Sequence, residues 1–140
     1  MSEVALFDPI TIKSKVFRNR IVLSPMCQYK AVDGLVSDWH FQHYSRFAFS
    51  GLGAAFIEAT GVSPEGRIGH GCTGIWSDEH IQSLSKIVKV FKEYNCVSGI
   101  QLAHAGRKAS FLRPWDGASP ITKEDSDEPA WQTIDQVQSQ

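Results

Sequence analysis

Three short apolar runs alternate with stretches of helical periodicity along this chain of 140 residues. The runs Ile21–Leu23, Ala54–Thr60 and Val97–His104 consist mostly of aliphatic, β-branched and small residues, which is typical of buried strands. Because helices fill the connections, the pattern predicts parallel strands joined by right-handed crossovers. The sequence therefore predicts an α/β fold.

Both connections carry the signals that begin and end α-helices. Ser37 is a suitable N-cap for the first helix, which we expect to end at Gly51. Ser77 is the expected N-cap of the second helix, and Asn95 closes it. Residues at helical spacing supply the predicted apolar faces: Phe41, Tyr44 and Ala48 in the first helix, and Ile81, Leu84, Val88 and Phe91 in the second.

The two ends of the chain have other patterns. Leu6–Ile12 and Val16–Phe17 flank a polar turn, which predicts a short β-hairpin before the first strand. After the third strand the periodicity is lost, and the acidic run Glu124–Glu128 indicates a loop. We expect residues 1–134 to form one folded unit and residues 135–140 to be a disordered tail.

Composition and charge argue against several classes of function. Lysine and arginine number 14 against 15 acidic side chains, so the charge balance does not favour nucleic acid as a partner. No apolar stretch approaches the ~20 residues that span a membrane, and the first residues lack the features of a secretory signal. Cys27, Cys72 and Cys96 are far apart, which argues against a disulfide framework or a structural zinc site. These features favour a reducing, cytoplasmic compartment.

Polar and reactive side chains lie where the three predicted strands end. Ser24–Tyr29 follows the first strand, Glu58–Thr60 ends the second, and Gln101 lies near the end of the third. Because the carboxyl ends of neighbouring parallel strands meet at one edge, we expect these residues to form one site. A thioether, a thiol and a phenol in the first segment suit a flat, electron-accepting ring.

Each of these residues also allows a structural interpretation. Cys27 can equally be a small buried residue of the core. Gln101, inside a predicted buried strand, needs partners for its amide, because an unpaired buried group costs ~1–3 kcal/mol. Glu58 needs a partner as well, and Arg20 or Arg107 could supply it. We expect four histidines to be structural: His40, His43, His70 and His80.

Six motifs, in order and at consistent spacing, connect the chain with a known family. They are Leu6–Ile12, Asn19–Tyr29, Glu58–Val62, Gly66–Ile68, Gly74–His80 and Gln101–Lys108. Over residues 5–134 the chain resembles the N-terminal part of Old Yellow Enzyme flavoproteins, in the bacterial and fungal branch that has a cysteine near the flavin. The GxSxG motif of serine hydrolases and the P-loop motif are absent.

The resemblance implies a fold and an activity. It implies the N-terminal three β/α units of a TIM (β/α)8 barrel, preceded by the short β-hairpin. It also implies an FMN-dependent oxidoreductase of the ene-reductase type, which takes hydride from NADPH and passes it to an electron-poor alkene.

The resemblance assigns roles to individual residues. Ala59 would contact the flavin through its backbone, and Gln101 would bind the pyrimidine edge. Cys27 would tune the flavin potential and Tyr29 would touch the substrate, which makes these two the catalytic candidates. His104 and Arg107 would support that corner of the site. Four consecutive residues would line the flavin: Ser24, Pro25, Met26 and Cys27.

The length of the chain sets the alternatives. A TIM barrel typically needs ~250 residues, so we expect an incomplete barrel that does not hold FMN tightly alone. The alternative function is an inactive truncated fragment, or a split-enzyme subunit completed by a partner chain; a homodimer is a further expectation. A thiol redox protein that uses Cys27 is a weaker interpretation, because no second cysteine lies nearby in sequence.

Overall fold

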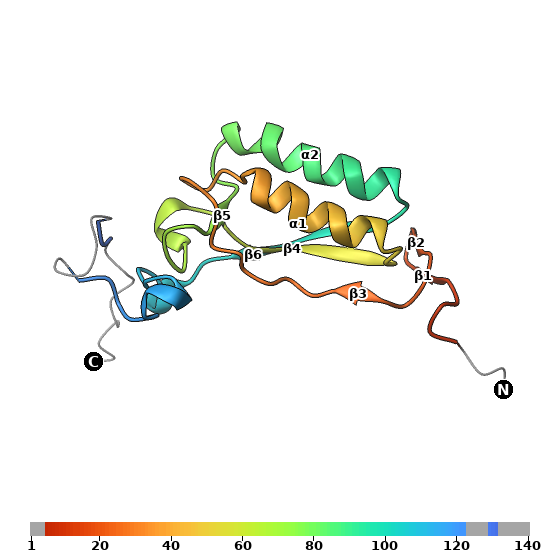
Figure 1. The fold of residues 1–140 in the computed structure, drawn as a ribbon, viewed down its shortest axis with the longest axis horizontal. Helices are drawn as coiled ribbons and strands as arrows, with labels where there is room; N and C mark the ends of the chain where they lie inside the picture. Colours follow the sequence, from red (N-terminus) through yellow and green to blue (C-terminus); the bar gives the residue numbers. More distant parts are fainter. Residues whose placement is uncertain (1–4, 123–128, 132–140) are drawn as a thin grey trace.

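The computed structural model describes residues 5–122 and 129–131. Two α-helices alternate along the chain with the strands of a parallel sheet and lie over one of its faces, and a separate hairpin precedes them (Figure 1). The acidic loop and the tail predicted from the sequence lie outside the described residues. The elements in chain order are β1 (Ile10–Ile12), β2 (Lys15–Phe17), β3 (Val22–Leu23), α1 (Asp38–Phe49), β4 (Ala54–Gly61), β5 (Thr73–Gly74), α2 (Glu79–Glu93) and β6 (Val97–Ala103).

The predicted parallel arrangement of the three main strands is confirmed. β3 and β6 both pair with the central strand β4, and both run parallel to it. The short strand β5, which the sequence pattern did not predict, also pairs in parallel with β4, at Thr60 and Gly61. A two-residue Thr–Gly pair within a glycine-rich loop has no periodicity of its own, so only the neighbouring strand reveals it.

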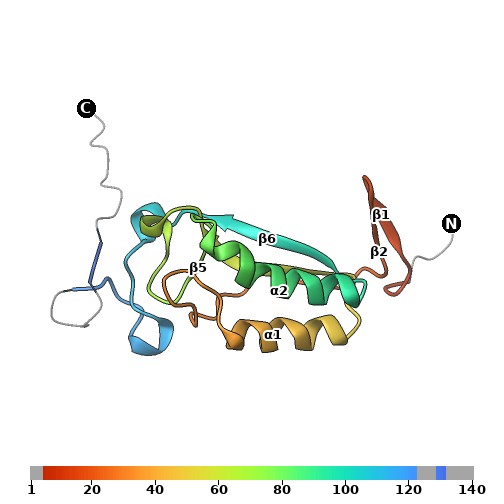
Figure 2. The same ribbon diagram turned by 90° about the horizontal axis from the view of Figure 1, so that it is seen from above.

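The two helices cover one face of the sheet and form the core with it. Figures 1 and 2 show α1 and α2 side by side over β4 and β6. The predicted core positions Tyr44, Ala48, Leu84 and Phe91 are buried there. Residues of β3 and β4 complete the core from the sheet: Leu23, Ala55 and Ile57.

Two predicted core positions are wrong. Ile81 is 57% exposed and Phe41 is 40% exposed, whereas the neighbouring His80 and His40 are buried. A histidine can occupy a buried helix face when other groups pair with its ring nitrogens. Because the prediction counted both histidines as polar residues, it began the buried face of each helix one residue too far along the chain. In α2, Ile87 is buried, whereas the predicted core residue Val88 is half-buried.

β1 and β2 pair in antiparallel fashion at the place where the sequence pattern predicted a hairpin. Ile10 is the partner of Phe17, and Ile12 is the partner of Lys15. This hairpin lies at the end of the sheet where the parallel strands begin (Figure 1). The opposite end of the sheet, where β4 and β6 end, therefore remains open to the loops that carry the candidate site.

No α-helix of the described residues covers the second face of the sheet (Figure 2). On this open face Phe56 packs against Gly99, where a β-carbon would meet the phenyl ring. In the described residues, β6 is followed only by 3-10 turns, Gly106–Lys108 and Pro114–Asp116. The described residues thus contain the strand of the predicted third β/α unit but no α-helix after it.

Candidate functional site

The three positions that the sequence assigned to one site lie together. Ala59 on β4 is the register partner of Gln101 on β6. Cys27, in the segment after β3, lies beside the backbone of Ala59, which partly offsets the rise that burial causes in the pKa of its thiol. The segment that begins at Ser24 therefore runs beside the carboxyl ends of β4 and β6, as parallel pairing requires.

A β-bulge in β4 interrupts the alternation of side chains between the two faces of the sheet. Ile57 pairs with Ile100, but the next pair is Ala59 with Gln101, so Glu58 is the extra residue. Ile57 and Glu58, consecutive in the strand, are both buried, and Ala59 follows as a half-buried residue. Bulges redirect side chains in this way and occur often beside active sites.

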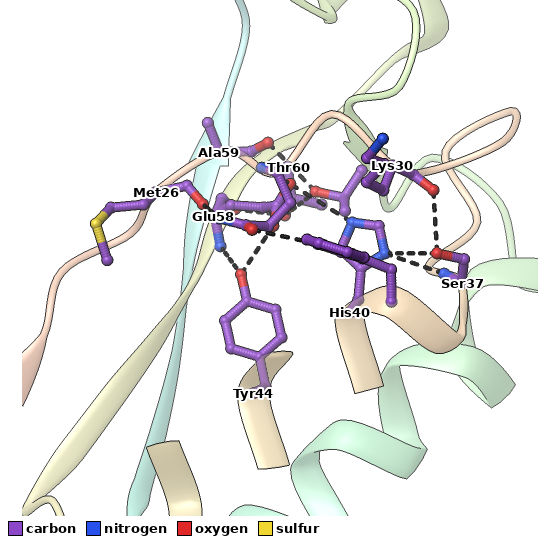
Figure 3. Close-up of polar contacts among 11 residues, drawn as sticks. Met26, Lys30, Ser37, His40, Tyr44, Glu58, Ala59 and Thr60 are labelled. Carbon is purple, nitrogen blue, oxygen red and sulfur yellow. Dashed lines mark hydrogen bonds and ion pairs between the residues drawn. The ribbon is translucent and has the colours of Figure 1, made fainter. Parts of the chain in front are cut away.

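The Glu58 carboxylate lies at the centre of a buried polar network (Figure 3). The Tyr44 hydroxyl donates to Oε2 at 3.0 Å, and the Gln28 backbone amide donates to Oε1 at 2.9 Å. The Glu58 amide donates in turn to the Tyr44 oxygen at 2.8 Å. His40 Nε2 lies 3.6 Å from Oε1, and both side chains are fully buried. The network joins α1, β4 and the segment after β3.

The predicted arginine partners of Glu58 are wrong. Arg20 and Arg107 are both exposed, and the carboxylate is instead satisfied by a phenol and a backbone amide. Those partners lie 14 and 30 residues away along the chain. A sequence pattern identifies the need for a partner, but tertiary packing chooses it.

His40 and His80 have the structural roles that the sequence predicted. The Ser37 amide donates to His40 Nδ1 at 3.1 Å, and the Ser77 amide donates to His80 Nδ1 at 3.2 Å. His80 Nδ1 also lies 2.9 Å from the Ser77 carbonyl oxygen, so both polar backbone groups of Ser77 contact this ring nitrogen. The other ring nitrogen of His40, Nε2, faces Glu58.

Burial keeps the thiol and the phenol of the site protonated. Burial first, and then the nearby Cys72 and Glu58, raise the pKa of Cys27 to about 11. Burial likewise raises the pKa of Tyr29 to about 12, with Cys27 as the next cause. The two side chains are neighbours, and each affects the pKa of the other. Both groups are thus neutral hydrogen-bonding groups at pH 7, and the thiol is a poor nucleophile.

Two other expectations change in the structure. Gln101 is exposed, not buried, and its amide makes no hydrogen bond to any described residue. It lies on an edge strand whose open face has no covering layer in the described residues. His104 and Arg107 are also exposed, and no hydrogen bond among the described residues joins them to Cys27.

The residues present fit a flat, partly polar ring. The half-buried Ala59 has a small side chain, and Gln101 offers an unpaired amide at the same level of the sheet. Met26 is 48% exposed, and its side chain points away from the Glu58 network (Figure 3). Pro25 is half-buried and Ser24 exposed. Together they provide a polarizable surface with a donor and an acceptor at its edge.

One cavity lies beside this region and a larger one lies away from it, and sequence reasoning anticipated neither. Tyr29, Lys30, Arg113 and Trp115 line a cavity of about 240 Å³ beside the site, with the Lys30 ammonium 4.8 Å from the Trp115 ring centre. A larger cavity of about 800 Å³ lies between the outer faces of α1 and α2. That larger cavity is remote from the strand ends and shares no lining residue with the site.

Two classes of site are missing from the described part of the chain. In residues 5–122 and 129–131, no cluster of histidine, cysteine and acidic side chains could hold a metal ion. Neither α1 nor α2 has the length and apolarity that crossing a membrane requires.

Comparison with known proteins gives a consistent result. Residues 5–138 match the model of the NADH:flavin oxidoreductase / NADH oxidase family. An NADPH dehydrogenase of Geobacillus thermodenitrificans is 44% identical over 85% of this chain and 38% of its own length. An NADPH dehydrogenase of Bacillus subtilis is 49% identical over 74% of this chain and 31% of its own length.

Solved structures agree with the sequence relatives. The Old Yellow Enzyme homologue of Zymomonas mobilis superposes with a TM-score of 0.71 and 30% identity, over 76% of this chain and 30% of that one. The chain thus spans 31–38% of the length of these two sequence relatives.

Proposed function

The chain belongs to the NADH:flavin oxidoreductase / NADH oxidase family, and we propose that it forms the flavin-ring half of an FMN-dependent NADPH oxidoreductase of the ene-reductase type. Its three parallel strands would be the first three of a TIM barrel. Residues 1–134 would belong to that barrel domain. Electron-poor alkenes are the proposed substrates.

One observation carries this proposal: Cys27, Ala59 and Gln101 meet at the open edge of the sheet. The family has its flavin at the carboxyl ends of barrel strands, and ligands of such folds bind there. We assign Ser24, Pro25, Met26 and Cys27 to the face of the ring, Ala59 to its edge, and the unpaired amide of Gln101 to the pyrimidine edge.

When bound, FMN would accept hydride from NADPH and pass it on to the alkene. The protein's part is binding and electrostatics. The neutral Cys27 thiol and Tyr29 phenol would provide hydrogen bonds beside the ring, and neither loses its proton near pH 7. A protonated thiol beside the ring disfavours extra negative charge there less than a thiolate would.

A split enzyme is the second candidate, and the open face of the sheet favours it. Val22 is 47% exposed and Phe56 is 39% exposed on strands that have helices on one side only. A chain with the remaining β/α units would cover this surface. An inactive fragment is the remaining alternative, and the same experiment distinguishes it.

The test is flavin binding with and without a completing chain. The purified 140-residue protein is titrated with FMN, and then with FMN plus a polypeptide that supplies the other barrel units. We expect weak binding alone, and tight binding with NADPH oxidation in the mixture. No flavin binding in either sample would contradict the proposal, and an inactive mixture that binds FMN would indicate a remnant.

A matched pair of variants tests the assignment of Gln101. Gln101→Leu removes the unpaired amide at the site, while Gln82→Leu changes an exposed glutamine on α2. We expect Gln101→Leu to weaken FMN binding by about tenfold, because an unmet polar edge of the ring costs ~1–3 kcal/mol. Gln82→Leu should bind as the unchanged protein does, and equal affinities for both variants would remove Gln101 from the site.

A further inference from the structure

We propose that Glu58 is a positioning residue, whose buried carboxylate holds Cys27 and Tyr29 in place by binding the backbone amide of the residue between them. This inference rests on the proposed function, because that function makes Cys27 and Tyr29 the residues whose placement matters. The hydrogen bonds on which it depends can be tested without any flavin.

The first step is the hydrogen bond itself. Gln28 N–H donates to Glu58 Oε1 at 2.9 Å, across 30 residues of sequence. The Gln28 side chain holds the same segment from within, because its Nε2 donates to the Met26 carbonyl at 2.9 Å. Trp39 of α1 donates from Nε1 to Gln28 Oε1 at 3.3 Å. Gln28 is therefore fixed to β4 and α1, and its two neighbours are fixed with it.

The second step is the backbone that results. Tyr29 has a positive φ of 52°, a conformation that a bulky residue adopts only under constraint. A firm anchor at the preceding amide can hold that conformation. The anchored Tyr29 ring then reaches Trp115, with ring centres 6.1 Å apart.

The third step is the cost of the arrangement. Glu58 lies at a bulge that interrupts the β4–β6 ladder, and its side chain is 0% exposed. Burying a carboxylate seldom adds stability, and an apolar residue often packs there equally well. Stability alone thus gives no reason for a carboxylate at position 58, whereas anchoring the Gln28 amide does.

The fourth step is electrostatic. The charge of Glu58 helps to raise the pKa of both Cys27 and Tyr29, after burial as the main cause. Tyr29 faces the thiol from its own segment, Cys72 from the loop before β5, and Tyr44 from α1. Glu58 is the carboxylic acid of this group, whereas the others are thiols and phenols. The negative charge of its carboxylate helps to keep those thiols and phenols protonated.

The first experiment measures amide hydrogen exchange by NMR in the full 140-residue protein. In the unchanged protein we expect the Gln28 amide to be protected. In Glu58→Gln, which replaces a charged acceptor with a neutral one, Gln28 should exchange about fivefold faster relative to the amides of β4. Tyr44→Phe keeps the carboxylate, so its relative Gln28 exchange should stay within about twofold of the unchanged protein.

The second experiment measures alkylation of each cysteine by a neutral reagent across pH, resolved by peptide mass spectrometry. Glu58→Gln should speed alkylation of Cys27 about threefold or more below its pKa, because the lost negative charge favours the thiolate. Cys96, whose pKa Glu58 does not affect, is the internal control. If Glu58 contributed to stability alone, Glu58→Gln would change the alkylation rates of Cys27 and Cys96 by the same factor.

Each outcome is decisive. An unprotected Gln28 amide in the unchanged protein overturns the proposal, even if Glu58→Gln does not fold. Unchanged relative exchange in Glu58→Gln, or an unchanged ratio of Cys27 to Cys96 alkylation, also overturns it. Because neither measurement uses FMN, a failure of flavin binding would affect only the proposed function.

Discussion

The Cys27 thiol lies among groups that all oppose its ionisation. Burial comes first, and the acids around it, Cys72 and Glu58, add to the effect. Cys72 and Cys96 are buried as well, and burial raises the pKa of each. All three cysteines are free. Such thiols react slowly near neutral pH, which disfavours the thiol redox alternative.

Alkaline pH should destabilise the fold through Cys27. Its pKa is about 11 in the folded protein against a model-compound value of 9.0, so the folded state keeps a proton that the unfolded chain releases. This contribution to stability is fully present below pH 9 and is lost as the pH rises toward 11. Urea midpoints at about pH 8 and about pH 10 should fall more in the unchanged protein than in Cys27→Ser. Equal decline in both proteins would show that Cys27 does not contribute.

The same sequence motif precedes both helices, although the N-cap of α2 is Asp78 and not the predicted Ser77. The sequence Ser–Asp–X–His occurs at Ser37–His40 and at Ser77–His80, and in each case the serine amide donates to the histidine ring. The second ring nitrogen then contacts a distant segment: Glu58 for His40, and the Asp33 carbonyl for His80. Each cap thus fixes a helix start and the approach of another element.

Removal of one cap histidine tests this motif. His80→Ala removes the acceptor for the Ser77 amide, a contact with the Asp33 carbonyl and a buried ring that packs on Trp76. We expect a loss of about 2–4 kcal/mol of unfolding free energy, measured by urea denaturation. His104→Ala, on an exposed residue, should cost less than about 0.5 kcal/mol. Similar losses in the two variants would contradict a capping role for His80.

The whole molecule has two layers where a barrel protein has a closed structure. Helices cover one face of the sheet, and β6 pairs in the described residues with β4 alone. Leu102 on this edge strand is 63% exposed. An exposed strand edge with apolar side chains is a site at which chains associate.

Self-association should follow from this edge. Sedimentation at about 10 and about 200 μM should show a concentration-dependent increase in mass. Leu102→Lys should reduce it, because a charge at a sheet edge opposes pairing. Ile81→Lys, at a similarly exposed position on α2, should leave it unchanged. If both lysine variants behave alike, association does not involve the edge strand.

Much of the site could be predicted from the sequence, but only in outline. Apolar runs and helix caps placed the elements, and the parallel order then brought positions 27, 59 and 101 together. The pattern could not show that Gln101 would be exposed, because exposure depends on what covers the strand. Nor could it find Tyr44 and Gln28 as the partners of Glu58, since nothing local distinguishes a tyrosine of the core from one that binds a carboxylate.

The sequence by itself determined the alternation of strands and helices, because side-chain periodicity and capping act over a few neighbouring residues. It also determined the family, through motifs that keep their order and spacing. Only the tertiary structure decided that a bulge buries Glu58 and leaves Ala59 beside Gln101. That choice depends on hydrogen bonds between residues 14 to 30 positions apart, which exist only once the helices pack on the sheet.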